Sequence, residues 1–194
     1  MQEFHALLEL LAMLMFDPRT AVLIALLVIA GVTDYRTYRI PNWLTFGGAA
    51  FALIYKTVIA VSPGTALLMA SGGLLLGFVL LLPLYMLHAM GAGDVKLMAM
   101  VGAFLGADET LQAVLCAFIA GGVGAIGFAL AKGRLGQMLR NTREALFSLV
   151  SLSVAGVRPD ARTHAAQSVG RLPYGVCICV GTIGYVLSRQ LGFA

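Results

Sequence analysis

The sequence predicts an all-α, polytopic membrane protein with about six transmembrane helices, and two observations lead to this fold class. The first is composition: 60% of the 194 residues are hydrophobic and 11% are charged, whereas about a quarter of the residues of a soluble domain are charged. The second is that several apolar runs reach the roughly 20 residues that a helix needs to cross about 30 Å of hydrocarbon. The alternating short segments of a membrane β-barrel are not seen. One integral-membrane domain over residues 1–194 is therefore expected.

Six apolar runs are separated by turn signals, and each is predicted to form a spanning helix. The runs cover residues 19–33, 43–61, 65–88, 95–107, 109–131 and 173–190. The fourth run gives only about 20 Å of helix at 1.5 Å per residue, which is less than the bilayer core of about 30 Å. We therefore expect the GAGD turn before it to dip into the membrane and line a wet pocket, unless the bilayer thins there.

Two other segments have apolar residues at helical spacing beside polar ones, which is typical of helices that lie on a membrane surface. One covers residues 3–16 within the N-terminal segment 1–17, and the other lies in the cytoplasmic segment 132–171 and carries arginines on its second face. A basic face favours contact with anionic lipids. Membrane lipids are therefore expected partners, and nucleic acid is not.

The distribution of positive charge orients the helices. With the N-terminus outside, the inner segments 34–42, 89–96 and 132–171 hold ten of the thirteen basic residues. Cytoplasmic loops of membrane proteins carry an excess of Lys and Arg. This orientation is therefore predicted over its inverse.

Two acidic residues, Asp34 and Asp94, stand at the cytoplasmic ends of predicted helices, one after the first run and one before the fourth. The topology puts both at the same depth, and an ionisable group at that depth is by default a functional hypothesis. The alternatives are structural. Asp94 could be a helix N-cap or pair with Lys96, and Asp34 could pair with Arg36 or Arg39.

Two close carboxylates at low dielectric have a defined chemistry, because both cannot ionise at low cost. One keeps its proton and can donate it to a carbonyl oxygen, while the other stays ionised and can take a proton from water. This division of labour is that of aspartic proteases. Gly91 and Gly93 fit such a site, because glycine allows positive φ and close approach of a substrate backbone. Helix packing is the alternative role for any single glycine in this chain.

Three blocks of residues resemble a known family. Residues 91–94, GAGD, resemble the GxGD signature of intramembrane aspartyl proteases. Residues 34–45, DYRTYRIPNWLT, resemble the first catalytic block of the type IV prepilin peptidases, D-x-R-x-x-x-I-P-N-x-L-T. Residues 173–175, PYG, are similar to the third block, P-[FY]-G. GxGD alone is a weak signal in a glycine-rich chain. Along the chain the three blocks come at 34–45, 91–94 and 173–175, which is the order of the family, and together they are a strong signal.

The resemblance implies an inner-membrane endopeptidase that removes the leader peptide of prepilins or pseudopilins on the cytoplasmic side, usually after a glycine. Asp34 and Asp94 match the two catalytic aspartates of the family. Bifunctional members also carry paired CxxC motifs, which bind zinc and are linked to N-methylation. This sequence has three cysteines and no CxxC, so it is similar to the short Tad or Flp form. Neither a metal nor another cofactor is expected, and the substrate pilin and oligomeric state are left open.

The first two blocks also contain supporting residues. Lys96 could tune the carboxylate pair, pair with Asp34, or only balance charge. Arg36 could hold an acidic part of the substrate or anchor the first helix at the lipid headgroups. Pro41 and Asn42 are expected to build the turn that positions Asp34.

The last block has two interpretations. Pro173, Tyr174 and Gly175 either abut the active site or simply begin the last helix, where Pro suits the first turn. His88 is expected to be interfacial or helix-capping. The three cysteines, Cys116, Cys177 and Cys179, lie in apolar runs and are expected to be small buried hydrophobic residues.

Three other functions compete with leader cleavage. A broader protease of the presenilin type also uses GxGD, but the IPN-x-LT block and the small size argue against it. A proton-coupled transporter could use Asp34 and Asp94 in a relay, although a relay usually extends across the membrane. A non-catalytic membrane protein for pilus assembly is the third alternative.

Overall fold

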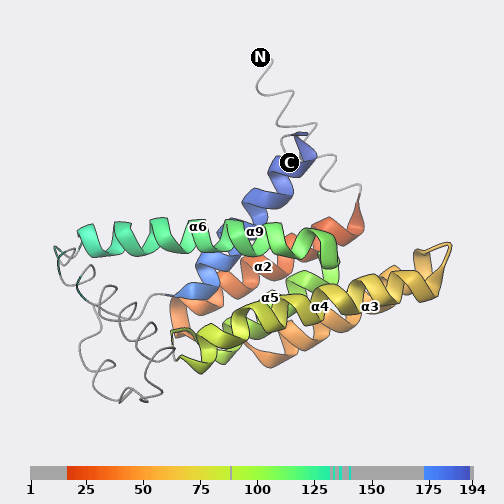
Figure 1. The fold of residues 1–194 in the computed structure, drawn as a ribbon, viewed down its shortest axis with the longest axis horizontal. Helices are drawn as coiled ribbons and strands as arrows, with labels where there is room; N and C mark the ends of the chain where they lie inside the picture. Colours follow the sequence, from red (N-terminus) through yellow and green to blue (C-terminus); the bar gives the residue numbers. More distant parts are fainter. Residues whose placement is uncertain are drawn as a thin grey trace, which may run out of the picture. The chain divides into compact units, whose positions relative to one another are not determined.

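A computed structural model describes residues 17–87, 89–131, 133, 136, 140 and 173–192, and in them the chain forms six α-helices and no strand (Figure 1). The helices are α2 (Pro18–Thr37), α3 (Asn42–Ile59), α4 (Pro63–Met86), α5 (Ala92–Leu105), α6 (Ala107–Ala131) and α9 (Tyr174–Gln190). The all-α class is confirmed. The predicted surface helix over 3–16 and His88 lie outside the described residues, as does the segment 132–171 apart from residues 133, 136 and 140.

Three of the helices are long and apolar enough to cross a membrane, namely α2, α4 and α6. The other three are shorter, with 18 residues in α3, 14 in α5 and 17 in α9. Large apolar side chains are exposed on several helices, for example Val58, Leu68 and Ile119. Such surface fits contact with lipid, so the chain is a membrane protein.

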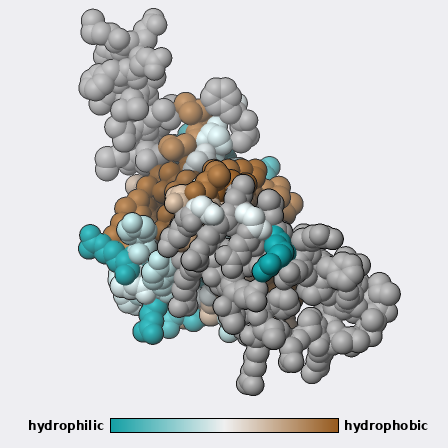
Figure 2. All heavy atoms as spheres, turned by 90° about the vertical axis from the view of Figure 1, so that its left-hand side faces the viewer, coloured by the Kyte–Doolittle hydropathy of each residue, from teal (hydrophilic) through white to brown (hydrophobic). Residues whose placement is uncertain are grey.

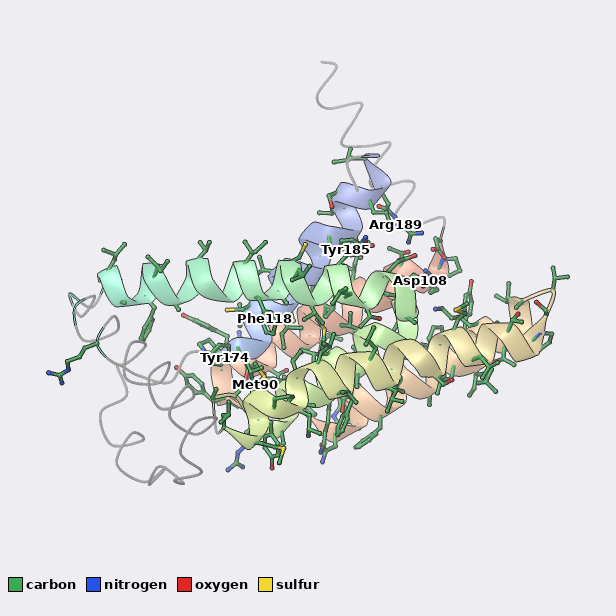
Figure 3. All side chains as sticks on the ribbon, in the orientation of Figure 1. Met90, Asp108, Phe118, Tyr174, Tyr185 and Arg189 are labelled. Atoms are coloured by element: carbon green, nitrogen blue, oxygen red, sulfur yellow. The ribbon has the colours of Figure 1, made fainter. Side chains whose placement is uncertain are left out.

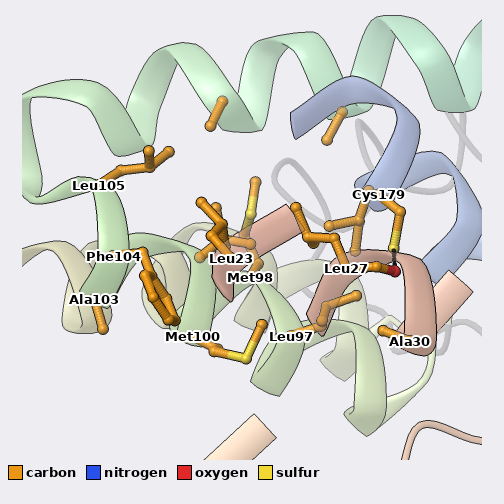
Figure 4. Packing of buried hydrophobic residues seen from close by; sticks show 14 of the residues in the cluster. Leu23, Leu27, Ala30, Leu97, Met98, Met100, Ala103, Phe104, Leu105 and Cys179 are labelled. Carbon is orange, nitrogen blue, oxygen red and sulfur yellow. Dashed lines mark hydrogen bonds between the residues drawn. The ribbon is translucent and has the colours of Figure 1, made fainter. Parts of the chain in front are cut away.

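Helix α5 is enclosed by other helices in a unit that comprises residues 1–121 and 173–194, while residues 122–172 form a second unit. It packs against α2, α3, α4 and α9. From Asp94 to Leu105 every side chain except Lys96 is buried. Figure 4 shows its apolar residues together with Leu23 and Leu27 of α2 and Cys179 of α9. The shortest of the six described helices is therefore surrounded by other helices of the protein.

The closest approach of two helices is that of α4 and α5, and it depends on glycine. A Cβ atom on Gly73 would collide with the carbonyl oxygen of Gly102 and would lie 2.6 Å from the carbonyl carbon of Gly106. A Cβ on Gly77 would lie 2.5 Å from the carbonyl oxygen of Met98. Small residues let the backbones of membrane helices approach each other in this way.

Local signals explain where α2 and α5 end. Asp17 caps the start of α2 by accepting hydrogen bonds from Arg19 N at 3.1 Å and Thr20 Oγ1 at 2.8 Å. The helix ends at Tyr38, which has a left-handed φ of 52° and donates its N–H to the Asp34 carbonyl oxygen at 2.8 Å. At the end of α5, Gly106 has a φ of 98°, which glycine adopts without steric cost and which lets the chain turn into α6.

Two predicted boundaries are wrong in a way that concerns the acidic residues. The first run was expected to end at residue 33, but α2 continues to Thr37 and contains Asp34. The GAGD stretch was expected to be a turn, but α5 begins at Ala92, so that only Gly91 lies outside the helix. Hydropathy marks where apolar residues stop, whereas both helices extend through a polar turn whose aspartate points into the protein.

Candidate active site

Asp34 and Asp94 are buried at the same end of the first unit. Asp34 lies in the last turn of α2 with 5% of its surface exposed, and Asp94 lies in the first turn of α5 with 7% exposed. The two helices are in contact. Figure 3 shows Met90 and Tyr174, the labelled neighbours of this end, close together, whereas Asp108 and Arg189 lie at the opposite end. Both aspartates, 60 positions apart in the sequence, are therefore buried on helices that contact each other.

The carboxylate of Asp94 closes the start of its own helix. Its Oδ2 accepts the N–H of Gly91 at 3.0 Å, and its backbone N–H donates to the Gly91 carbonyl oxygen at 3.1 Å. Gly91 is the N-cap residue and Asp94 is the third helical residue, so the proposed role of Asp94 as the N-cap is wrong. A carboxylate at this position supplies one half of a capping box.

The conformation expected of the two glycines in this stretch is also wrong. Gly91 has a φ of −81° and Gly93 is helical, and neither is among the positive-φ glycines of the described residues. Gly93 is instead a contact site, because a Cβ there would lie 3.3 Å from the Cβ of Ile40. The glycine at 93 provides space for a side chain of the protein itself.

The first turn of α9 meets the aspartates. A Cβ on Gly175 would lie 2.7 Å from Asp34 Oδ2 and 2.9 Å from Asp34 Cγ. Pro173 is the N-cap of α9, and Gly175 in the first turn lies next to the Asp34 carboxylate.

The start of α3 is tied to α5 through Lys96. Lys96 Nζ donates to Asn42 Oδ1 at 2.9 Å and lies 5.3 Å from the centre of the Phe46 ring. Lys96 therefore hydrogen-bonds to Asn42 at the start of α3. Pro41 is the N-cap of α3, and its carbonyl oxygen accepts the N–H groups of Leu44 and Thr45. Pro41 and Asn42 therefore begin α3.

Hydrophilic side chains lie at the surface of this end. Arg36 and Arg39 are exposed, Arg36 in the last turn of α2 and Arg39 in the link to α3. Figure 2 looks onto this side of the molecule and shows hydrophilic groups beside hydrophobic surface. Both roles considered for Arg36, substrate contact and headgroup anchoring, require such exposure.

The cysteines differ in their surroundings. Cys179 is buried, and its Sγ donates to the Leu27 carbonyl oxygen at 2.9 Å. Cys116 and Cys177 are only partly buried, so the expectation of buried cysteines holds for Cys179 alone. Within the described part of the chain, no group of three or more His, Cys, Asp or Glu side chains could hold a metal ion.

Replacing Gly175 by alanine is expected to lower the rate of peptide cleavage by about 10- to 100-fold, because the new methyl group and the Asp34 carboxylate cannot occupy their present positions together. The measurement is the cleavage rate of the purified protein. Gly184→Ala on the same helix is the matched control, since nothing lies within 4 Å of a Cβ there. Equal rates for the two variants would contradict the prediction.

Replacing Lys96 by methionine is expected to lower the free energy of unfolding by about 1 kcal/mol, because one hydrogen bond and one cation–π contact are lost. Thermal unfolding in detergent measures the change. Asn42→Ala removes the same hydrogen bond, so the double variant should lose less than the sum of the two single losses. Full additivity would show that the bond contributes nothing.

Comparison with known proteins places the chain in a family. Residues 21–126 match the sequence model of the type IV leader peptidase family, and this range includes both aspartates and the start of α3. It covers more than half of the 194 residues. No curated protein and no solved structure matches the chain.

Sequence reasoning missed one residue of this site. Ile40 contacts Gly93 and lies close to Gly175. In the sequence it stands out only as part of the IPN block. The signal was its position next to Pro41 in a four-residue link between two helices. A short link of this kind keeps its residues near the helix ends that it joins.

Proposed function

Because the chain belongs to the type IV leader peptidase family, we propose that it is a membrane aspartyl endopeptidase that removes the leader peptide of prepilins or pseudopilins. The observation that carries the proposal is the burial of Asp34 and Asp94 at one end of the unit, on two different helices that contact each other. A pair of acids at one end also favours hydrolysis over a proton relay, which usually extends across the membrane.

The proposed reaction is direct attack of water on the scissile carbonyl. The ionised carboxylate of the pair takes a proton from the water molecule, and the protonated one donates a hydrogen bond to the carbonyl oxygen. Collapse of the tetrahedral intermediate breaks the C–N bond, and the leaving nitrogen takes up a proton. The two carboxyl groups share one proton at the start, and its titration is a property of the pair and not of either aspartate alone.

The proposed topology sets all six helices across the inner membrane, with the N-terminus periplasmic and the aspartate end toward the cytoplasm. The charge distribution of the sequence supports it, since ten of the thirteen basic residues then lie on the cytoplasmic side. With 14 residues, α5 is about 21 Å long. Asp94 at its first turn would then lie below the headgroup level, where the scissile bond of a membrane-inserted substrate can reach it.

The surrounding residues support the pair in this proposal. Gly175 leaves room for the Asp34 carboxylate, and Gly91 holds the Asp94 carboxylate through its N–H. Lys96 and Asn42 fix the start of α3 against α5. Arg36, which is exposed beside them, is available to an acidic group of the substrate.

Co-expression tests the proposed function. The chain is produced in a bacterium together with a prepilin that has a short basic leader, a glycine before the cut and an apolar helix, and leader removal is followed by gel shift. Loss of the leader is expected only when the chain is present. The matched control is the same prepilin with the glycine replaced by a large residue, which should stay uncut. An uncut parent prepilin, across a panel of such substrates, would overturn the proposal.

A further inference from the structure

Ile40 fills the space between two glycines that flank the aspartate pair. A Cβ on Gly93 would lie 3.3 Å from Ile40 Cβ and 3.6 Å from Ile40 Cγ1. A Cβ on Gly175 would lie 2.9 Å from Ile40 Cδ1. Gly93 directly precedes Asp94 in α5, and Gly175 lies in the first turn of α9. One side chain from the link between α2 and α3 therefore touches both of the other helices at the site.

The same side chain lies next to the Asp34 carboxylate. Asp34 Oδ2 and Ile40 Cδ1 lie 2.7 Å and 2.9 Å from one point, the position that a Cβ of residue 175 would take. Neither group could keep its place if that point were filled. Ile40 thus borders Asp34 on one side and the residue before Asp94 on the other.

The backbone that carries Ile40 is held at both ends. Tyr38 closes α2 with its left-handed conformation and its bond to Asp34, and Thr37 Oγ1 donates to the Arg39 carbonyl oxygen at 3.2 Å. Pro41 on the other side has a fixed φ and begins α3. Ile40 is partly buried and packs against the apolar core of the unit.

We propose that Ile40 is a positioning residue for the acidic pair: its side chain wedges between α5 and α9 and holds the two carboxylates at a working separation. The inference rests on the proposed function. Its physical basis is that catalysis requires the reacting groups to be held within a fraction of an ångström, and that a misplacement of 1 Å can cost about 100-fold in rate. The wedge acts through the aspartates and does not itself react.

Two substitutions shorten the Ile40 side chain to different extents and should lower kcat to different extents. Ile40→Val removes Cδ1, the atom nearest Gly175, and keeps Cβ and Cγ1, the two atoms nearest Gly93. Ile40→Ala removes both contacts beyond Cβ. With a purified protein and a synthetic leader-bearing peptide, kcat should fall about threefold for the valine variant and about 10- to 100-fold for the alanine variant. KM should stay within about twofold of the wild-type value, because the peptide still binds while the carboxylates are displaced.

Leu105→Ala is the control for loss of packing alone. It removes the same number of carbon atoms from the far end of α5, where Leu105 is also buried. Its kcat should stay at the wild-type level. An equal fall in kcat for Leu105→Ala, or an unchanged kcat in both Ile40 variants, would overturn the inference. If the alanine variant does not fold, the valine variant decides by the same criterion.

The proposed function can fail separately. If the wild-type protein does not cleave, or if Asp94→Asn cleaves at the wild-type rate, the peptidase proposal fails. If the wild type cleaves, Asp94→Asn does not, and the Ile40 variants keep the wild-type kcat, only the role of Ile40 is wrong.

Discussion

Asp34→Asn and Asp94→Asn are each expected to lower leader cleavage by about 100- to 10,000-fold, the range that a positioned acid or base contributes. Asparagine has nearly the same shape as aspartate, but it can neither take a proton from water nor cycle between two protonation states. Because the proposed mechanism uses the two carboxylates as a unit, each single substitution should cost about as much as the double one. The measurement is the initial rate of cleavage by purified protein.

Asp108→Asn is the matched control. Asp108 is exposed in the first turn of α6, at the end of the unit opposite Tyr174 (Figure 3). Its substitution should leave the rate unchanged. All three variants should reach the membrane in wild-type amount, which separates loss of chemistry from loss of protein. Wild-type cleavage by either Asp34→Asn or Asp94→Asn would remove that residue from the mechanism.

Gly73→Ala is expected to have the largest effect on stability. The new methyl group would collide with the backbone of Gly102 and lie 2.6 Å from the backbone of Gly106, and a backbone cannot rotate away as a side chain can. Overpacking typically costs about 1–3 kcal/mol, and we expect a loss of about 3 kcal/mol or more here because both neighbours are main chain. The temperature at which the detergent-solubilised protein aggregates should fall accordingly.

Gly72→Ala on the same helix is the control for this prediction. A Cβ at Gly72 meets only the Cβ of Ala107, at an ordinary 3.7 Å. Alanine favours helix over glycine by about 1 kcal/mol, so this variant should be as stable as the wild type or slightly more so. Similar aggregation temperatures for Gly73→Ala and the wild type would show that α4 and α5 do not approach as closely as described.

The sequence was sufficient to predict the helices of the described residues, because hydropathy and turn residues determine where apolar runs begin and end. Charge and topology also led to the prediction that Asp34 and Asp94 lie at one end, and the structure buries both on helices that contact each other. It was not sufficient to show that Asp34 belongs to the last turn of α2. That turn is polar in sequence, and its helical state depends on the cap at Tyr38 and on burial against α9.

Contacts between distant segments were the least predictable part of the site. That Lys96 would bond Asn42, and that Gly93 would face Ile40, follows from how α3 and α5 pack, which no local pattern encodes. The PYG block predicted Gly175 as a candidate site residue. Only the structure explains why glycine stands there, because a Cβ would collide with the Asp34 carboxylate. The glycines of GAGD were expected to allow positive φ and close approach of a substrate backbone, whereas the helix uses Gly91 as its cap and Gly93 as space for the Ile40 side chain.

The most direct measurement of the central claim is the mass of the products formed when purified protein is incubated with a synthetic prepilin segment. The proposed hydrolysis predicts two fragments whose masses add up to the substrate plus one water molecule, with the cut at the end of the leader. The double variant Asp34→Asn/Asp94→Asn should form neither fragment. The same fragments with the double variant, or none with the wild-type protein on any leader-bearing segment, would contradict a leader peptidase that works through this pair of aspartates.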